Sequence, residues 1–197
     1  MKKFLMAMIV GLIICAGVKV EAAIFNEEQF KNLLVITVQD AEAVKEKNLP
    51  SDAATFQKQF NAYMTKFIEE SNTEEDKGEM MKEIFLIGDP PASEGKPSLF
   101  GKNFLGKNAV IGLIDENNNL KVVDLFAAPE DENDSFVTAL VVNAFMQGFM
   151  TEAEAEEVLQ QFDKNSSEPV IKNGIKFSFR KSTENGEEVK ILMATAE

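Results

Sequence analysis

Apolar residues recur at helical spacing near the start of the chain. Phe30, Leu33, Leu34, Val38 and Ala41 follow one another every three or four positions. Such spacing is typical of an amphipathic helix. Asn26 followed by Gln29 resembles a capping box, so the pattern predicts a helix over about 27–46. The β-branched stretch 35–38 leaves a strand as the alternative for part of this region.

A second amphipathic stripe follows a Pro-Ser pair at 50–51. Its members are Phe56, Phe60, Tyr63, Met64, Phe67 and Ile68. The stripe predicts a helix over about 52–71, with Phe60 at the centre of its buried face. The charged and polar residues 71–79 predict a linker or a short acidic turn. The apolar run 83–87 predicts a strand.

The middle of the chain carries turn and strand signals. Three prolines and two glycines predict an exposed loop over 88–98. Two apolar runs, 109–114 and 120–126, predict two strands. The Asn-rich segment Asp115–Asn119 lies between them and predicts a hairpin turn.

Two helices are predicted after this hairpin. The acidic stretch Glu130–Asp134 precedes the nearly all-apolar run Phe136–Met150. Acidic residues or Asn at such a start cap a helix and interact favourably with its dipole, and an apolar surface all round predicts burial. Thr151 and Glu154 then form a second capping box, which predicts a helix to about Phe162.

The C-terminal part carries the clearest pattern. Apolar and polar residues alternate over 175–180 and over 189–195. The pair Asn185-Gly186 between them is a strong hairpin signal. The chain thus reads helix, helix, three strands, helix, helix, two strands. This order predicts an α+β fold, a mainly antiparallel sheet of about five strands with helices packed on one face. In topology alone it is similar to small acidic secretion-chaperone-like domains, with no shared motif.

The N-terminus has the pattern of a secretory signal peptide. Lys2 and Lys3 precede an unbroken apolar run over 4–18, and small residues stand at Ala22 and Ala23. The apolar run is shorter than the roughly 20 residues that a membrane-spanning helix needs. We therefore expect cleavage between Ala22 and Ala23.

Cleavage there would release one secreted or periplasmic domain over 23–197, with no membrane insertion afterwards. Two alternatives are an uncleaved N-terminal anchor and a lipoprotein acylated at Cys15. The segment before Cys15 resembles a lipobox, but Ile14 stands where a small residue is expected.

Charge narrows the range of partners. The chain has 20 basic and 33 acidic residues. Removal of residues 1–22 takes away three lysines and one glutamate, which leaves 17 basic and 32 acidic residues and a net charge of −15. Nucleic acids and anionic membranes attract basic surfaces. We therefore expect neither as a partner, and a basic protein or an envelope component fits the charge better.

Missing residue types exclude several chemistries. The chain has no histidine, and its single cysteine, Cys15, would leave with the signal peptide. A Ser-His-Asp triad, a His-ligated zinc site and thiol chemistry are therefore excluded. The expected domain has no disulfide, so its core alone must stabilise the fold. The many phenylalanines and methionines are interpreted as core residues, and no cofactor or metal is expected.

Three short motifs resemble binding loops but lack essential residues. Gly101–Asn108 nearly matches a P-loop, yet Asn108 lacks the hydroxyl for Mg²⁺ and a strand rather than a helix is predicted to follow. The segment instead predicts two glycine turns. Asp115–Asn119 and Asp163–Ser167 start like EF-hand loops but lack the glycine and the closing glutamate. Loose calcium contact at these acidic turns is the most that they predict.

Two kinds of catalysis survive these exclusions, a Ser-Lys dyad and a pair of carboxylates. A catalytic carboxylate would stand alone in an apolar strand, and Asp124 is the candidate of that kind. Strand alternation predicts that Asp124 lies on the solvent face, so no catalytic residue is expected. The sequence therefore predicts an exported, non-catalytic binding or accessory domain. The alternatives are a periplasmic chaperone-like protein that holds apolar client segments, and a hydrolase.

Overall fold

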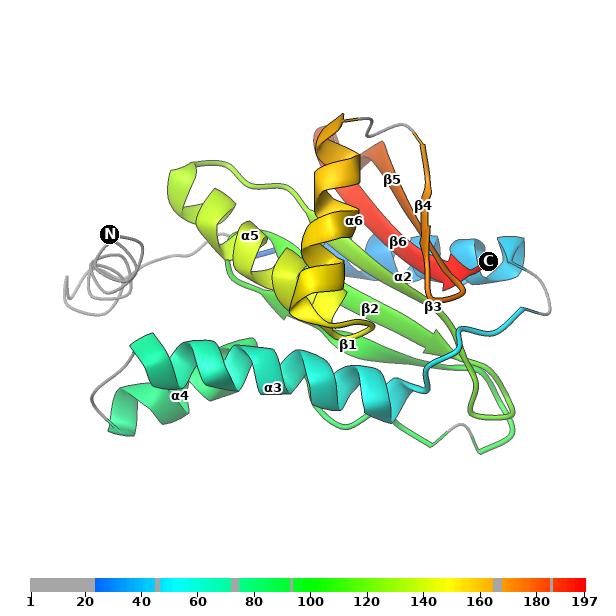
Figure 1. Ribbon diagram of the computed structural model, residues 1–197, viewed down its shortest axis with the longest axis horizontal. Helices are drawn as coiled ribbons and strands as arrows, with labels where there is room; N and C mark the ends of the chain where they lie inside the picture. The colour runs from blue at the N-terminus through cyan, green and yellow to red at the C-terminus, as the bar shows by residue number, and fades with distance from the viewer. Residues whose placement is uncertain (1–23, 45–46, 72–74, 93, 165–167, 185) are drawn as a thin grey trace.

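The computed structural model describes residues 24–44, 47–71, 75–92, 94–164, 168–184 and 186–197. These residues form an α+β fold in which helices pack on a six-stranded antiparallel sheet (Figure 1). The α+β class predicted from the sequence is confirmed. The predicted signal peptide lies outside the described residues and stays a prediction.

The bounds of the elements define the topology. The described helices are α2 (Glu27–Ala43), α3 (Ala53–Ser71), α4 (Glu75–Phe85), α5 (Glu132–Gln147) and α6 (Glu152–Lys164). The strands are β1 (Ser98–Phe104), β2 (Asn108–Ile114), β3 (Leu120–Ala127), β4 (Val170–Lys172), β5 (Ile175–Glu184) and β6 (Glu187–Ala196). The sheet order is β1-β2-β3-β6-β5-β4. Within the described ranges, no helix is long and apolar enough to cross a membrane.

Helix α2 begins where its cap predicts. The Asn26 side chain accepts a hydrogen bond from the Gln29 amide, and the Gln29 side chain accepts one from the Asn26 amide, both at 2.9 Å. The buried residues Leu33, Thr37 and Ala41 follow at a spacing of four, which places one face of the helix on the sheet. The alternative of a strand over 35–38 is therefore wrong.

One face of the sheet is covered by α3, α4, α5 and α6. Phe56 and Phe60 of α3 are fully buried there, with ring centroids 6.0 Å apart. The Phe60 ring also stacks on Phe104 of β1 at 5.8 Å. Val123 and Leu125 of β3 complete this core from the sheet. The prediction that Phe60 is central to a buried face is confirmed.

Helix α2 covers the opposite face, so the prediction of helices on one face is wrong. It packs against β2 and β3, where Ile111, Val122 and Phe126 are buried. Strand β3 is buried on both faces along its whole length. A strand that is apolar on both faces needs a layer on each side. Val123 and Leu125 on one face and Val122 and Phe126 on the other therefore carried a signal for two helical layers.

The region around α4 also differs from its prediction. Residues 75–79 of the predicted linker belong to α4, whereas 72–74 lie outside the described residues. The predicted strand over 83–87 is wrong, because α4 continues to Phe85. Met81 and Phe85 are both buried at a spacing of four, as one face of a helix requires. A short apolar run cannot be assigned to strand or helix from its composition alone.

Two strands were missed and the predicted strand over 83–87 is not formed, so the sheet has six strands instead of about five. The first glycine turn predicted within Gly101–Asn108 is instead part of β1, which pairs with β2 along its whole length. Gly101 has φ of 145°, and a Cβ atom there would lie 2.0 Å from the Val110 carbonyl oxygen. Only glycine fits this close approach. The other missed strand, β4, is three residues long.

Candidate functional site

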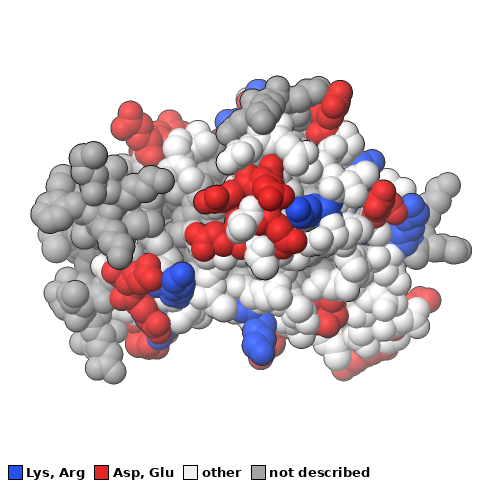
Figure 2. Space-filling model, viewed as in Figure 1, with Lys and Arg blue, Asp and Glu red and all other residues white. Residues whose placement is uncertain are grey.

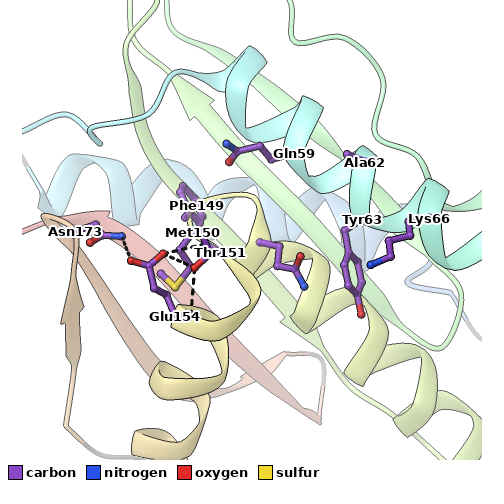
Figure 3. A pocket seen from close by; sticks show the side chains of 10 residues that line it. Gln59, Ala62, Tyr63, Lys66, Phe149, Met150, Thr151, Glu154 and Asn173 are labelled. Atoms are coloured by element: carbon purple, nitrogen blue, oxygen red, sulfur yellow. Dashed lines mark hydrogen bonds between the residues drawn. The ribbon is translucent and has the colours of Figure 1, made fainter. Parts of the chain in front are cut away.

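An open groove of about 550 Å³ lies between α3 and the junction of α5 with α6. The lining residues are Gln59, Ala62, Tyr63, Lys66, Gln147, Phe149, Met150, Thr151, Glu154 and Asn173. Figure 3 shows Tyr63 and Lys66 on the α3 side, facing Phe149, Met150 and Glu154 across the groove. The groove therefore combines an apolar part with polar and charged side chains.

The apolar part continues the aromatic core. The Phe149 ring lies 4.7 Å from Phe56 and 5.9 Å from Phe177, measured between centroids. Met150 is buried beside it. These side chains are held by the core behind them, so this wall of the groove is preformed.

Glu154 places a fixed negative charge at the end of the groove. Its carboxylate accepts hydrogen bonds from the Thr151 amide at 3.0 Å, the Thr151 hydroxyl at 2.8 Å and the Asn173 side-chain amide at 3.2 Å. These bonds, that from the Thr151 amide foremost, lower the pKa of Glu154 to about 2. The predicted capping box at Thr151 and Glu154 is confirmed, and it orients a charged group toward the groove.

The groove lies in a negative field. Burial raises the pKa of Tyr63 above its ordinary value, and the charges of Glu152 and Glu70 raise it further. Figure 2 shows acidic side chains gathered over α6, whose glutamates are Glu152, Glu154, Glu156 and Glu157. Lys66 is the one basic residue that lines the groove in the described part of the chain. The surroundings of the groove therefore favour a positively charged ligand.

Asp124 lies on the other face of the sheet, sealed beneath α2. Its side chain is 0 % exposed, so the prediction that it lies on the solvent face is wrong. Within the described residues, no hydrogen bond of ordinary length reaches either carboxylate oxygen or the Thr37 hydroxyl, although this hydroxyl lies close enough to the carboxyl group to act on its pKa. The alternation of β3 does separate two faces, but the second face is covered by a helix rather than by water.

The surroundings of Asp124 favour its protonated form. Burial is the main cause that raises its pKa, to about 8, and the charge of Asp40 adds to the effect. Thr37 and Arg180 act in the opposite direction but are outweighed. Asp40 is itself paired with Arg180 at 2.5 Å. The carboxyl group of Asp124 has no access to the groove, which lies across the sheet.

The lysines of the P-loop-like segment have structural partners. Lys102 donates hydrogen bonds to the carbonyls of Glu83 and Leu86 at the end of α4, the latter at 3.0 Å. Lysine at this position compensates carbonyls that have no partner within the helix. The second glycine turn predicted in this segment is present, at Gly106 and Lys107, and β2 follows it rather than a helix.

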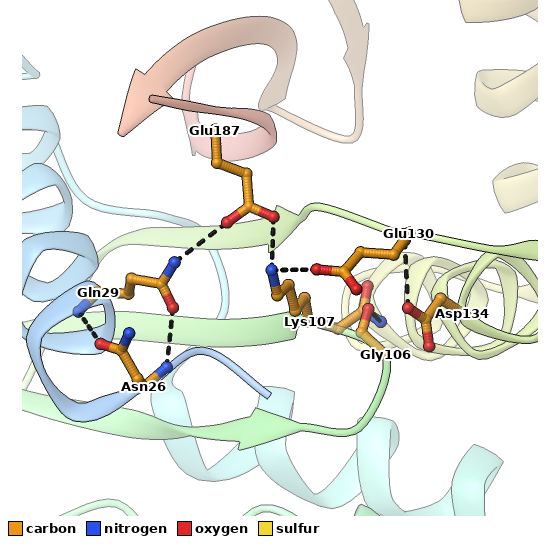
Figure 4. A network of polar contacts seen from close by, with 8 residues as sticks. Asn26, Gln29, Gly106, Lys107, Glu130, Asp134 and Glu187 are labelled. Atoms are coloured by element: carbon orange, nitrogen blue, oxygen red, sulfur yellow. Dashed lines mark hydrogen bonds and ion pairs between the residues drawn. The ribbon is translucent and has the colours of Figure 1, made fainter. Parts of the chain in front are cut away.

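Lys107 is the centre of a polar network around the start of α2 (Figure 4). It pairs with Glu130 and, at 2.7 Å, with Glu187. Hydrogen bonds to these two carboxylates raise the pKa of Lys107. The other oxygen of Glu187 accepts from the Gln29 side chain at 3.1 Å. The network links the first turn of α2 to the start of β6.

The acidic turn Asp115–Asn119 forms the predicted hairpin between β2 and β3. One oxygen of Asp115 accepts hydrogen bonds from the amides of Asn117 and Asn119, both at 2.8 Å. The carboxylate is thus engaged within its own turn. The segment Asp163–Ser167 lies largely outside the described residues. Among the described residues, no three His, Cys, Asp or Glu side chains are grouped as a metal site would require.

No known protein family matches the chain, and no curated protein or solved structure does. Function is therefore inferred from three features: the groove, the Glu154 carboxylate beside it and the buried carboxyl group of Asp124. The sequence pattern located Asp124 and the capping box, but it did not bring Tyr63, Phe149 and Glu154 together. Tyr63 carried a signal as the polar-tipped member of an otherwise fully apolar stripe.

Proposed function

We propose that this chain is an exported, non-catalytic binding domain whose ligand is a basic segment of a protein or envelope component. The groove between α3 and α6 receives an apolar side chain of that segment against Phe149 and Met150. Glu154 and the other glutamates of α6 attract its positive charge. The observation that carries the proposal is the Glu154 carboxylate, fixed by three hydrogen bonds at the end of a preformed apolar wall.

A chaperone-like role would use the same apolar wall without a charge requirement. A neutral apolar peptide should therefore bind as well as a basic one in the chaperone-like role, and more weakly in the proposed role. A hydrolase role for Asp124 is not part of the proposal, because its carboxyl group lies beneath α2 on the face of the sheet away from the groove.

Tyr63 offers a direct binding assay. It is the only tyrosine of the chain, which has no tryptophan, so tyrosine emission reports on the groove alone. The probe is a short peptide of alternating lysine and leucine. Its controls are the same peptide with glutamate or serine in place of lysine. We expect a saturable change for the lysine peptide, weakened by salt, and no comparable change for the glutamate peptide.

Two variants locate the binding. Glu154→Gln retains a side chain that can complete the capping box but removes the charge. We expect it to weaken binding of the lysine peptide by up to roughly fivefold, the cost of one partly exposed ion pair. Glu28→Gln removes an exposed charge from α2 on the opposite face and should leave binding unchanged. Equal responses to the lysine and glutamate peptides would contradict the proposal, and an equal response to the serine peptide would favour the chaperone-like role.

Export rests on the N-terminal pattern alone and has its own test. The protein recovered from its native envelope fraction or medium should have an intact mass that begins at Ala23. A mass that retains residues 1–22 would contradict cleavage. A diacylglycerol adduct on Cys15 would establish the lipoprotein alternative.

A further inference from the structure

Buried side-chain oxygens without a hydrogen-bond partner are concentrated where α2 meets the sheet. In the described part of the chain they are Thr37 Oγ1, Asn103 Oδ1, and both carboxylate oxygens of Asp124. Thr37 belongs to α2, and Asp124 lies beneath it on β3. Asn103 of β1 donates its amide to the Phe25 carbonyl, just before α2, at 2.6 Å. Because buried polar groups are almost always paired, this interface is the least well satisfied in the described structure.

Helix α2 also makes apolar contacts with the sheet. Leu33 and Ala41 are buried there, and four partly buried side chains pack beside them: Phe30, Leu34, Ile36 and Val38. Polar contacts join each end of the helix to the sheet, from Gln29 to Glu187 at 3.1 Å and from Asp40 to Arg180 at 2.5 Å. The stretch 35–38 is β-branched, which lowers the helix propensity of α2 itself. The docked position therefore combines apolar burial along α2 with an unsatisfied carboxyl group, Asp124, beneath the middle of the helix.

We propose that α2 is a releasable cover of the sheet, and that loss of the Asp124 proton drives its release. In the closed form an ionised Asp124 is buried without a partner. In the open form the carboxylate is hydrated, and the apolar surface around Ile111, Val122 and Phe126 is exposed to solvent or to a partner.

The charges around Asp124 do not compensate its ionisation. Asp40 on α2 repels the carboxylate, and Arg180 on β5 attracts it but is already paired with Asp40. Its strand neighbours, Ile111 on β2 and Met193 on β6, are apolar. Burial accordingly raises the pKa of Asp124 to about 8 in the closed form, whereas a hydrated aspartate titrates near 4.

This difference gives the opening a defined pH dependence. The open form releases one proton that the closed form retains between about pH 4 and pH 8. The opening equilibrium therefore rises by up to about tenfold per pH unit in that window and levels off above it. Both the slope and the plateau are properties of one carboxyl group, so a single substitution should remove them.

Amide hydrogen exchange of the protein between pH 5 and pH 9 tests the proposal. After correction for intrinsic exchange rates, we expect the amides of α2 to be less protected than those of α5 at every pH. Their protection should fall by up to about tenfold per pH unit and level off near pH 8. In Asp124→Asn the slope should vanish. In Thr37→Val, the matched control, α2 should be better protected with the slope retained.

Equal protection of α2 and α5 at every pH would overturn the proposal, because α2 would then open only when the whole domain unfolds. A slope that persists in Asp124→Asn would also overturn it. If that variant does not fold, Asp40→Asn decides: removal of the repelling charge should move the plateau to lower pH. An unchanged plateau in Asp40→Asn would count against the proposal.

Discussion

The face of the sheet under α5 and the face under α2 bury their polar groups in different ways. Under α5, the buried Asn108 donates to the carbonyls of Leu105 and Gly106 at 3.1 and 2.8 Å and accepts from Thr138 at 2.9 Å. Under α2, Asp124 is equally buried, and neither of its oxygens has a partner among the described residues. The buried polar group under α5 thus has its hydrogen bonds at any pH, whereas the stability of the face under α2 depends on the protonation of Asp124.

The two faces of the sheet therefore differ in how their packing should respond to pH. The aromatic core under α3 and α5 extends into the wall of the groove through Phe149, so the proposed binding surface is continuous with this core. The α2 face has apolar contacts of its own but holds a carboxyl group at its centre. Substitutions on the two faces should therefore differ in size and in pH dependence.

The largest effect is expected on the aromatic face. Phe60→Ala removes a fully buried ring that packs on Phe56 and Phe104. The loss should be about 3–5 kcal/mol in the free energy of unfolding, a large share of the roughly 5–15 kcal/mol that a domain has. Urea denaturation measures it, with Ile171→Ala, at a half-exposed position on β4, as the near-neutral control. A loss below about 1 kcal/mol would show that the ring is not in the core.

The next largest effect, counted per pH unit, is the pH dependence carried by Asp124. Its pKa is raised to about 8 in the folded protein and is near 4 in the unfolded chain. The folded state therefore binds more protons between these values, and its stability falls as pH rises from about 4 to 8. Asn is uncharged in both states, so Asp124→Asn should gain on the wild type by up to about 1.4 kcal/mol per pH unit. Urea melts of both proteins at several pH values measure this, and parallel curves would rule it out.

A pair of threonines sharpens the comparison further. Thr37 on α2 has an unpartnered buried hydroxyl, whereas the Thr138 hydroxyl on α5 donates to Asn108 at 2.9 Å. Valine has nearly the same shape as threonine and lacks the hydroxyl. We expect Thr37→Val to stabilise and Thr138→Val to destabilise the protein, each by about 1 kcal/mol. Thermal melts suffice for both, and the same sign for the two variants would refute the contrast.

The smallest expected effect concerns the groove. Burial and the charges of Glu152 and Glu70 raise the pKa of Tyr63. Since the chain has one tyrosine, an absorbance titration reads this group alone and should have its midpoint above that of a free tyrosine, near 10. Glu152→Gln should lower the midpoint, with Glu28→Gln as the distant control. A midpoint unaffected by Glu152→Gln would contradict the claim that the glutamates around the groove act on Tyr63.

The sequence predicted elements best where a local signal and the tertiary packing agree. The capping boxes at Asn26 and Thr151, the hairpin after β5 and the stripe through Phe60 are all present. Strand β1 was missed because Gly101, Lys102 and Asn103 have low strand propensity. Pairing with β2 overrides that propensity, which no local pattern reveals.

The site was harder to predict than the fold because its parts come from distant segments. Tyr63, Phe149 and Asn173 meet only through the packing of α3 and α6 on the sheet. Asp124 was singled out correctly as an unusual residue, but strand alternation gives two faces without saying whether both are covered. The second helical layer, α2, determines the chemistry of that carboxyl group.

The protonation of Asp124 in the docked state is the claim on which the contrast between the two faces depends. Carboxyl ¹³C chemical shifts of the aspartates, followed from pH 4 to pH 10 and assigned with Asp124→Asn, measure it directly. The account predicts that Asp124 titrates with a midpoint near 8, because burial beneath α2 disfavours its charge. A midpoint near 4 with α2 still protected from exchange would contradict the account, since the carboxylate would then be charged and stable within the closed interface.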